Sequence, residues 1–590
     1  MVKMNIIVTS YFFISLFPCG CKKNMHPQPS PPVTQPVTDT VVSISTDKAC
    51  YKPGEEVVFT INKNLPPSAV VCYMYLDSII TKAPFSKTTW VWQPPPKDFT
   101  GYIVEIYNME GENKKVYGSI AVDVSSDWTH FPRYGFLSEY GLLSKDHMDS
   151  VMEALNRYHV NGLQFYDWEY EHHQPLAGTV TSPDSSWKDI ANRTNYMSTV
   201  QAYIALAHQY NMKAMSYNLA YGALSDAASD DVSPQWYLYT DPNHVTKYTF
   251  NLPMPPFKSD IYLLDPSNPG WQNYIAGQTN NMYQVYNFDG YHVDQLGNLN
   301  KSLYTYAGNV VNLSTTFLPF LNAMKAASPN KRLVMNAVNQ YGQQESISRS
   351  PVDFLYTEVW SPNEGYQDLA NIIQQNDAWS DDTKRTILAA YMDYDIAKTS
   401  GYFNTPGVLL TDAVIFSFGG AHIELGDHML DNEYFPNSNL QMKPDLQKAI
   451  TKYYDFLTGY ENILRGNGTF NVPPLFNTDG KMPVSNWPPK TGNVSMIGKD
   501  MGNRQVIYLI NFANASSFDW RDAYGTQNAP VRFQDDAFTF NATKTVRKIW
   551  WASPDINSGV AQDIPFQQSE NSVSFVLPSL QYWDMIVVEY

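Results

Sequence analysis

Apolar residues alternate with polar ones in two separate parts of the chain, which is the pattern of strands with one buried face. Residues 39–125 and residues 466–590 both show short alternating runs separated by turns that contain Pro or Gly. The runs are Glu56–Ile61, Val70–Leu76, Tyr102–Ile106, Arg504–Ile510, Val546–Trp551, Val573–Leu577 and Met585–Val588. We therefore expect an N-terminal immunoglobulin-like β-sandwich and a C-terminal antiparallel β-sandwich.

Between these parts, residues 126–465 alternate between short apolar runs and longer segments with helical spacing. The strand candidates are Tyr134–Leu137, Gly162–Tyr166, Lys213–Tyr217, Gly290–Asp294, Leu333–Ala337, Phe354–Glu358, Ile387–Met392 and Ala413–Phe418. The helical segments include Asp146–Tyr158, Met197–Tyr210, Trp271–Tyr286, Thr316–Ala327 and Tyr366–Ala378. Eight strands with helices between most of them predict a (β/α)8 TIM barrel. The expected architecture is multidomain, with a central barrel flanked by two sandwiches.

The first residues have the features of a bacterial export signal rather than of a folded element. Lys3 is followed by the apolar run Ile6–Phe17, which is too short to span a bilayer. Residues 1–21 end at Cys21, which follows a glycine as in lipoprotein processing sites, and residues 22–38 form a Pro-rich linker. We expect Cys21 to be lipidated and the protein to be anchored at the outer membrane or cell surface of a Gram-negative bacterium. A periplasmic or secreted protein is the alternative.

Composition narrows the classes of partner. The chain of 590 residues has a formal net charge of −17 and 40 Lys and Arg residues, so a nucleic-acid partner is not expected. An acidic surface suits a protein that acts on a neutral polymer. The 41 Tyr and 14 Trp residues are numerous enough to line a sugar-binding cleft, although most such rings serve as core. Membrane contact is expected through the lipid anchor alone, and the protein is expected to be a monomer.

Cysteine and histidine usage gives no sign of a metal or another cofactor. Beyond the signal region the chain has Cys50 and Cys72, which could form a disulfide in an oxidising compartment or remain two buried thiols. His172 and His173 are adjacent and would point to different faces of a strand. We expect no cofactor and no metal.

Two carboxylates end the fourth and the sixth of the predicted strands. Asp294 closes the run Gly290–Asp294, and Glu358 closes the run Phe354–Glu358 two strands later in the chain. Acids at the carboxyl ends of parallel strands lie where barrel enzymes carry their chemistry. A pair of carboxyl groups with opposite protonation states is what cleavage of a glycosidic bond with retention requires. The sequence therefore predicts a glycoside hydrolase, with structural carboxylates as the alternative.

The surroundings of the two acids suggest their roles. Tyr356 and Trp360 flank Glu358 and are expected to raise its pKa, which favours it as the acid/base. Asp294 lies beside the polar residues His292 and Gln295, which favours it as the nucleophile.

Further polar and aromatic clusters follow the other predicted strands. They are Leu163–Leu176, Met215–Tyr221, Met335–Asn339 and Gly419–His428. Exposed rings in such loops suggest binding of a ligand, whereas capped helix starts are the simpler explanation for any one of them.

Four of these motifs, in the same order, resemble the signature regions of glycoside hydrolase family 66. The motifs are Gln164–Leu176, Phe288–Gly297, Tyr356–Trp360 and Gly420–Pro436. The family contains endo-dextranases and cycloisomaltooligosaccharide glucanotransferases. The resemblance implies retaining, endo-acting hydrolysis of α-1,6-linked glucan through a covalent glucosyl-enzyme, with Asp294 as nucleophile and Glu358 as acid/base. Among bacterial members, the chain looks most like a dextranase lipoprotein.

By position in these motifs, the resemblance also implies a set of side chains that bind dextran and isomaltooligosaccharides. They are Tyr166, Asp167, Trp168, Asn218, His292, Trp360, His422, Glu424 and Asp427. The cyclising members carry an additional carbohydrate-binding module inserted in the catalytic region, and residues 126–465 have no comparable β-rich insertion, so hydrolysis is favoured. A glucanotransferase, a hydrolase of another α-glucan and a non-catalytic surface glucan-binding lipoprotein remain alternatives.

Overall fold

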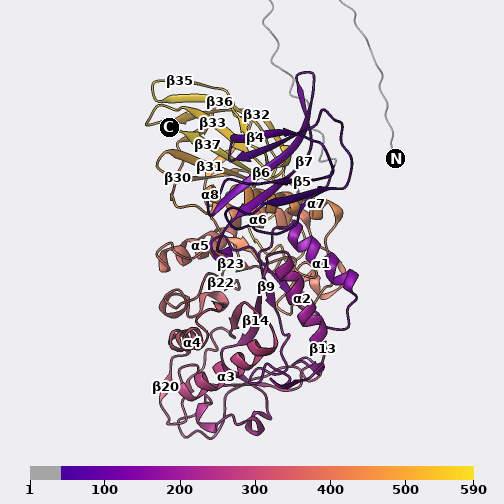
Figure 1. Cartoon of the computed structure of the whole chain (residues 1–590). Coiled ribbons are helices and arrows are strands. Elements are labelled where there is room, and N and C mark those ends of the chain that lie inside the picture. Colours follow the sequence, from indigo (N-terminus) through magenta and orange to yellow (C-terminus); the bar gives the residue numbers. More distant parts are fainter. Residues whose placement is uncertain (1–41) are drawn as a thin grey trace, which may run out of the picture. The chain divides into compact units, whose positions relative to one another are not determined.

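The computed structural model describes residues 42–590 (Figure 1). The predicted signal peptide with Cys21 and the Pro-rich linker lie outside the described residues. Within the described part, no helix has both the length and the apolar character needed to cross a bilayer. Strands dominate the chain, and they fall into an N-terminal, a central and a C-terminal region.

The N-terminal region contains two antiparallel sheets. The first pairs β1 (Ile44–Thr46), β2 (Val57–Ile61) and β5 (Thr89–Trp92); the second has the order β4 (Ser78–Pro84), β3 (Val70–Tyr75), β6 (Thr100–Glu110) and β7 (Asn113–Val124). Alternate residues of both sheets enter one hydrophobic cluster, in which Phe59 stacks on Trp90 at 5.0 Å and Tyr73 on Trp92 at 4.5 Å between ring centroids. Burial alternates along β2 and β5, so one face of each is covered, whereas β3, β6 and β7 are buried on both faces over most of their length.

The central region contains eight parallel strands in two sheets. They are β8 (Tyr134–Leu137), β9 (Gly162–Phe165), β14 (Lys213–Leu219), β18 (Gly290–Asp294) and β21 (Arg332–Met335) in one sheet, and β22 (Leu355–Glu358), β23 (Thr386–Ala389) and β25 (Ala421–His422) in the other. The strands within each sheet pair in chain order. Seven of the eight sequence-predicted strands are confirmed within two or three residues at each end.

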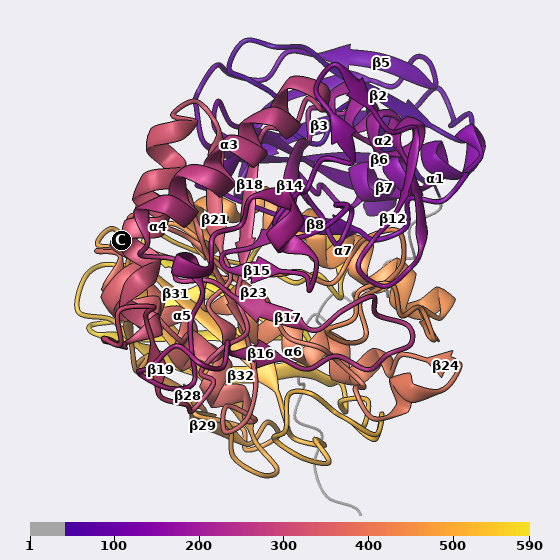
Figure 2. The same cartoon turned by 90° about the horizontal axis from the view of Figure 1, so that it is seen from below.

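Helices connect most of these strands. They are α1 (Lys145–Arg157), α2 (Met197–Gln209), α3 (Pro269–Val285), α4 (Leu313–Ala327), α5 (Tyr366–Trp379) and α6 (Thr405–Ser417). Two more helices, α7 (Pro444–Gly459) and α8 (Glu461–Leu464), follow the last of these strands. All five helical segments expected from the sequence are present. Helices α3 and α4 lie on one side of the parallel strands, and α1 and α2 lie on another (Figure 2).

The closed barrel expected from the sequence is not formed as one continuous sheet. Between β21 and β22 there is a single isolated bridge, Asn336 with Tyr356. Between β25 and β8 the backbone contact is a hydrogen bond from Phe136 N to Leu425 O at 3.1 Å. Because β25 has two residues, it is too short to continue the ladder to β8.

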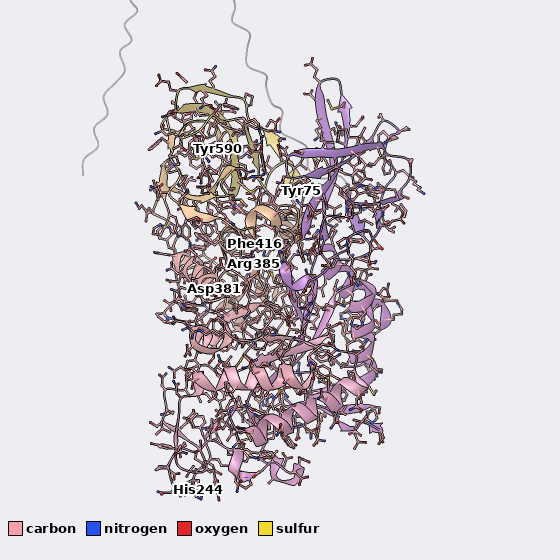
Figure 3. The ribbon with its side chains drawn as sticks, turned by 60° about the vertical axis from the view of Figure 1, so that its left-hand side comes forward. Tyr75, His244, Asp381, Arg385, Phe416 and Tyr590 are labelled. Atoms are coloured by element: carbon pink, nitrogen blue, oxygen red, sulfur yellow. The ribbon has the colours of Figure 1, made fainter. Side chains whose placement is uncertain are left out.

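The eighth strand was predicted in the wrong place. Ala413–Phe418 belongs almost entirely to α6, in which every residue from Gly407 to Ser417 is buried, and Phe416 lies in the interior (Figure 3). A helix that is apolar on all sides shows no amphipathic period, so a short window of it looks like a buried strand. Pro406 in the first helical turn is the signal that favours a helix here. The actual strand is β25, four residues beyond α6.

The C-terminal region again contains two sheets. The larger has the order β27 (Thr469–Asn471), β30 (Val494–Asp500), β31 (Arg504–Asn511), β37 (Trp583–Glu589), β33 (Lys548–Ala552) and β34 (Gln562–Asp563), with β29 (Val484–Asn486) beside β30; the smaller has the order β28 (Leu475–Asn477), β32 (Phe533–Asn541), β36 (Ser572–Leu580) and β35 (Phe566–Ser569). Leu509 and Ile586 of the larger sheet share a hydrophobic cluster with Phe538 and Phe575 of the smaller.

Short strand pairs stand in the loops of the central region. They are β10 (Gly178–Thr179) with β11 (Ser182–Pro183), β12 (Ser186–Lys188) with β13 (Thr194–Tyr196), β15 (Gly222–Ala223) and β16 (Thr249–Phe250) with β17 (Ile261–Leu263), β19 (Leu303–Tyr304) with β20 (Val310–Val311), and β24 (Gly401–Tyr402) with β26 (Leu440–Gln441).

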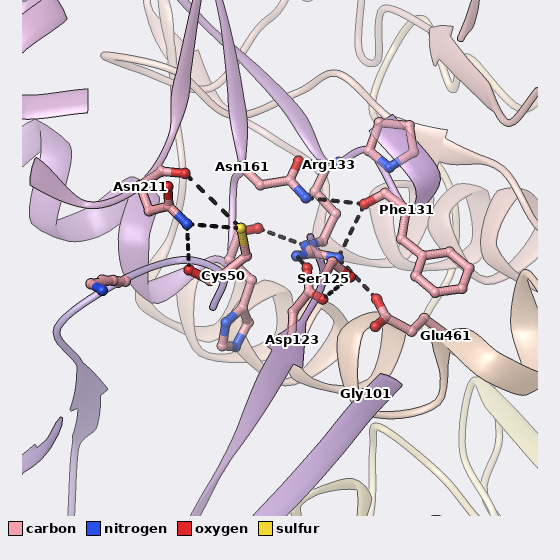
Figure 4. Close-up of polar contacts among 12 residues, drawn as sticks. Cys50, Gly101, Asp123, Ser125, Phe131, Arg133, Asn161, Asn211 and Glu461 are labelled. Atoms are coloured by element: carbon pink, nitrogen blue, oxygen red, sulfur yellow. Dashed lines mark hydrogen bonds and ion pairs between the residues drawn. The ribbon is translucent and has the colours of Figure 1, made fainter. Parts of the chain in front are cut away.

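A buried arginine joins the N-terminal and central regions. The guanidinium of Arg133, just before β8, donates to Asp123 of β7, to Glu461 of α8 at 3.1 Å and to the carbonyl of His159 at 2.6 Å (Figure 4). Arg133, Asp123 and Glu461 have no exposed side-chain surface. Both Cys50, which faces Asn211 in the same view, and Cys72 are buried free thiols, so of the two alternatives for these cysteines the structure has the unpaired one.

Candidate active site

A cavity of about 590 Å³ opens at the carboxyl ends of the parallel strands. The strands β9, β14, β18 and β22, together with the residues that directly follow them and β21, supply most of its inner wall. Its polar and aromatic lining residues are Gln164, Tyr166, Asp167, His172, Tyr217, Phe250, Phe257, His292, Asp294, Gln295, Asn336, Tyr356, Glu358, Trp360, Tyr391, Glu433, Tyr434 and Phe435. This volume suits a ligand of a few rings.

Asp294, the last residue of β18, is held by three hydrogen bonds. Its Oδ2 accepts from the hydroxyl of Tyr217 at 2.6 Å, and its Oδ1 accepts from Asn336 Nδ2 and from the backbone N–H of Gln295, both at 2.8 Å. Burial raises the pKa of Asp294, and these donors act in the opposite direction because they stabilise the carboxylate. The three donors together fix the orientation of the Asp294 carboxylate.

Glu358, the last residue of β22, is also held by three donors. Its Oε2 accepts from Asn336 Nδ2 at 2.8 Å, while Oε1 accepts from Trp360 Nε1 at 2.9 Å and from the Tyr391 hydroxyl at 3.1 Å. Burial, and then the negative charge of Asp294, raise the pKa of Glu358 to about 7. A group with this pKa can hold a proton and release it near neutral pH.

The amide of Asn336 bridges the two carboxyl groups. Because its single nitrogen lies 2.8 Å from an oxygen of each, Asp294 Oδ1 and Glu358 Oε2 are separated by at most twice 2.8 Å. The strand order explains this proximity, since Asn336 follows β21, which pairs with β18 and is bridged to β22. The site therefore presents two carboxyl groups side by side on the cavity wall, each held by three donors and each with a raised pKa, which for Glu358 is about 7.

Four of the other sequence-predicted residues line the same cavity. Tyr166 stacks on Phe435 with ring centroids 4.4 Å apart, and Trp360 and Asp167 lie on the wall as well. Burial raises the pKa of Asp167 to about 8. His292 lies deeper, stacked on a buried tyrosine, and burial lowers its pKa to about 3, so its imidazole is neutral.

The remaining five sequence-predicted residues do not line the cavity. Trp168 is packed against Phe288 at 5.0 Å in the core, and Asn218 donates to the carbonyl of His172 at 2.8 Å behind the wall. His422 and Glu424 are buried: His422 bonds to Asp412 and to the carbonyl of Ala390, and Glu424 accepts from the Tyr454 hydroxyl. Asp427 is half-buried and accepts from the backbone N–H groups of Ser138 and Glu139. None of these five residues lines the cavity, so this placement gives them no direct contact with a ligand in it.

Sequence reasoning did not single out several of the residues that hold the pair. Asn336 and Tyr217 lie in the polar stretches at predicted strand ends, and Tyr391 is the second-last residue of the seventh predicted strand, so position in a strand is the signal that could find them. Glu433 and Tyr434 reach the cavity from a loop for which spacing carries no such signal.

Among the described residues, two clusters of histidine and carboxylate side chains could hold a metal ion. They are Glu171 with His173 and Asp230, and Asp412 with His422 and Glu424. Lys258 lies 3.6 Å from Glu171 in the first, and both ring nitrogens of His422 are already hydrogen-bonded in the second. Neither cluster contains the carboxyl pair.

Known proteins resemble this chain over most of its length. A cycloisomaltooligosaccharide glucanotransferase of Niallia circulans is 27% identical over 92% of this chain and 71% of its own length. A dextranase of Streptococcus salivarius is 24% identical over 83% of this chain and 67% of its own. The crystal structure of a Paenibacillus cycloisomaltooligosaccharide glucanotransferase, in complex with cycloisomaltoheptaose, superimposes with a TM-score of 0.85 at 25% identity, covering 93% of this chain and 99% of that one. Residues 46–587 match the model of glycosyl hydrolase family 66, and the chain belongs to that family.

Proposed function

We propose that this protein is a retaining, endo-acting glycoside hydrolase that cleaves α-1,6-glucosidic linkages of dextran to isomaltooligosaccharides. The observation that carries the proposal is the amide of Asn336 between the two carboxyl groups. It holds their nearest oxygens within twice 2.8 Å of each other, whereas the carboxyl groups of inverting enzymes are roughly 6.5–9.5 Å apart because a water molecule must fit between them. A spacing this short favours direct attack by a carboxylate.

The reaction then proceeds in two displacements. A carboxylate oxygen of Asp294 attacks the anomeric carbon while Glu358 gives its proton to the departing glycosidic oxygen, so that one sugar chain leaves with a free hydroxyl and the other is esterified to Asp294. Glu358, now ionised, takes a proton from an incoming water, whose oxygen attacks the same carbon and releases Asp294 as a carboxylate. The donors on Asp294 favour its ionised form against the effect of burial, and the raised pKa of Glu358 suits both of its steps.

Transfer to a sugar hydroxyl is the second candidate function, and a specific observation favours it. The relatives with the higher identity are glucanotransferases, and the superimposed structure is one of them. Against this, the alignment with the Niallia enzyme spans 708 positions although this chain has 590 residues, so that enzyme carries sequence within the aligned region that this chain lacks. We therefore favour water as the acceptor.

The proposal includes the architecture and location expected from the sequence. The two sheets of the central region are proposed to act as one (β/α)8 barrel, residues 126–465, between sandwiches at 39–125 and 466–590. We also propose export by residues 1–21 and anchoring by a lipid on Cys21. Labelling with a radioactive fatty acid, which a Cys21→Ala variant should not incorporate, tests the anchor.

The activity is tested by incubating the purified protein with dextran and, in parallel, with starch, and resolving the products by size and linkage. We expect linear isomaltooligosaccharides from dextran alone. Cyclic products would identify a glucanotransferase, and cleavage of starch would contradict the proposed specificity for α-1,6 linkages. Asp294→Asn should abolish cleavage but retain dextran binding, whereas Asp146→Asn on the exposed face of α1 should behave as the wild type. Binding of dextran by a wild-type protein that cuts neither polymer would identify a binding protein instead.

A further inference from the structure

One stretch of the C-terminal region, Phe518–Ala523, lies against the loops that follow β22 and β23. It belongs to the connection between β31 and β32. The backbone N–H of Trp520 donates to Glu364 O at 3.1 Å, and the N–H of Asp393 donates to Arg521 O at 2.8 Å. Two loops of the central region are thus bound by one segment that comes more than 120 residues later in the chain.

The side chain of Arg521 extends this contact toward the cavity. Its Nη2 donates to the carbonyl of Val359 at 2.9 Å, and its Nη1 donates to the carbonyl of Tyr391 at 3.2 Å. The guanidinium also stacks on aromatic rings, with its carbon 4.9 Å from the ring centroid of Trp360 and 5.1 Å from that of Tyr394. One planar group therefore contacts the backbone of both loops and one aromatic ring from each.

These contacts converge on the carboxyl group of Glu358. Trp360 Nε1 and the Tyr391 hydroxyl both donate to its Oε1, and Val359 is the next residue in the chain. Arg521 thus touches both donors of that oxygen, Trp360 through its ring and Tyr391 through its carbonyl. If Arg521 is lost, both donors and the backbone beside Glu358 lose a support at the same time.

We propose that Arg521 is a positioning residue for the acid/base Glu358, and that the C-terminal region thereby completes the active site. This inference rests on the proposed function. Arginine is suited to the task because its flat, forked guanidinium can donate to two carbonyl groups while its face lies on a ring. A lysine ammonium cannot meet all of these partners in one geometry.

The test compares two substrates that differ in their need for an acid. Dextran needs a proton on the leaving oxygen, whereas a 2,4-dinitrophenyl isomaltoside does not. In the Arg521→Ala variant, kcat on dextran should fall about 100-fold and KM should change little. A loss of this size is expected when a reacting group, here the Glu358 carboxyl, is displaced by about 1 Å. The first-turnover release of dinitrophenolate should stay near the wild-type rate. Arg532→Ala removes an exposed arginine of the same connection, bonded to Ser579, and should leave both rates unchanged.

Equal loss on both substrates, or loss on neither, overturns the proposal. If circular dichroism shows that Arg521→Ala does not fold, Arg521→Lys decides: a selective loss on dextran supports the role, and wild-type rates overturn it. If the wild type cleaves neither substrate, the proposed function fails, but the role of Arg521 can still be tested by a measurement that needs no turnover. The tryptophan fluorescence that is lost in Trp360→Phe comes from Trp360, and its intensity should change with pH as Glu358 gains or loses its proton. In Arg521→Ala this change should occur at higher pH. An unshifted titration overturns the positioning role.

Discussion

Replacing Asn336 with alanine removes one amide that donates to both carboxyl groups of the site. A hydrogen bond to a charged group is worth about 1.5–3 kcal/mol. At 1.36 kcal/mol per unit, loss of the donor should raise the pKa of Asp294 by about 1–2 units, because the carboxylate loses the stabilisation. The pKa of Glu358, already about 7, should rise in the same direction for the same reason.

The two shifts predict a displacement of the whole pH profile of dextran cleavage. Activity needs Asp294 ionised, so the acid limb should move to higher pH; it also needs Glu358 protonated, so the alkaline limb should move up too. On the acid side of the wild-type optimum the rate should fall about 10- to 100-fold, which corresponds to one to two units.

The assay is the initial rate of reducing-end formation from dextran between pH 3 and 9. The control is Asn330→Ala, an exposed amide in the turn before the opposite end of the same strand, β21, which should leave the profile unchanged. A profile of Asn336→Ala that keeps its position, or that moves to lower pH, would refute the reasoning.

Three further outcomes are expected. The wild-type rate on dextran should decline as pH rises through about 7, because Glu358 loses its proton, and a Glu358→Gln variant should be slow without that decline. A wild-type rate that does not change up to pH 9 would contradict the role of Glu358 as the acid. Arg133→Ala leaves Asp123 and Glu461 buried without their cation and should lower the free energy of unfolding in urea by about 3–5 kcal/mol, whereas a loss below 1 kcal/mol would show that the cluster relaxes. The pKa of Asp455 is lowered to about 2 by Arg157 and His159 against the effect of burial, so its stabilisation should be present above pH about 4 and disappear as pH falls toward 2. Asp455→Asn should therefore be less stable at pH 7 and lose less stability between pH 4 and 2, and parallel curves for the two proteins would contradict this.

Local pattern was sufficient to find most of the parallel strands and the helices between them. Asp294 and Glu358 were found together because parallel strands bring their carboxyl ends to one edge, which is a rule of topology rather than of spacing. The same rule failed at the eighth strand. With Ala413–Phe418 as the predicted eighth strand, His422 falls in a loop at the rim, whereas in the structure it lies within β25 and its ring bonds to Asp412 and to a backbone carbonyl.

Contacts between distant segments could not be predicted. Nothing in the sequence around Arg521 indicates that it meets Val359 and Tyr391, because the three residues are brought together by the docking of the C-terminal region. Asn336 could be placed at a strand end, but its bridging position depends on the bridge between β21 and β22, which is a tertiary feature. Trp168 shows the converse: it follows two cavity residues in the chain, yet its ring turns into the core.

The central claim is that Asp294 forms a covalent glycosyl ester, and mass spectrometry of the trapped protein tests it most directly. In Glu358→Gln, α-isomaltosyl fluoride should react because fluoride leaves without a proton, while release of the ester is slow without the base. We predict that the peptide containing Asp294 gains the mass of one isomaltosyl group, and that the double variant with Asp294→Asn gains none. An adduct on another residue, or hydrolysis of the fluoride without any adduct and with inverted product, would contradict the account.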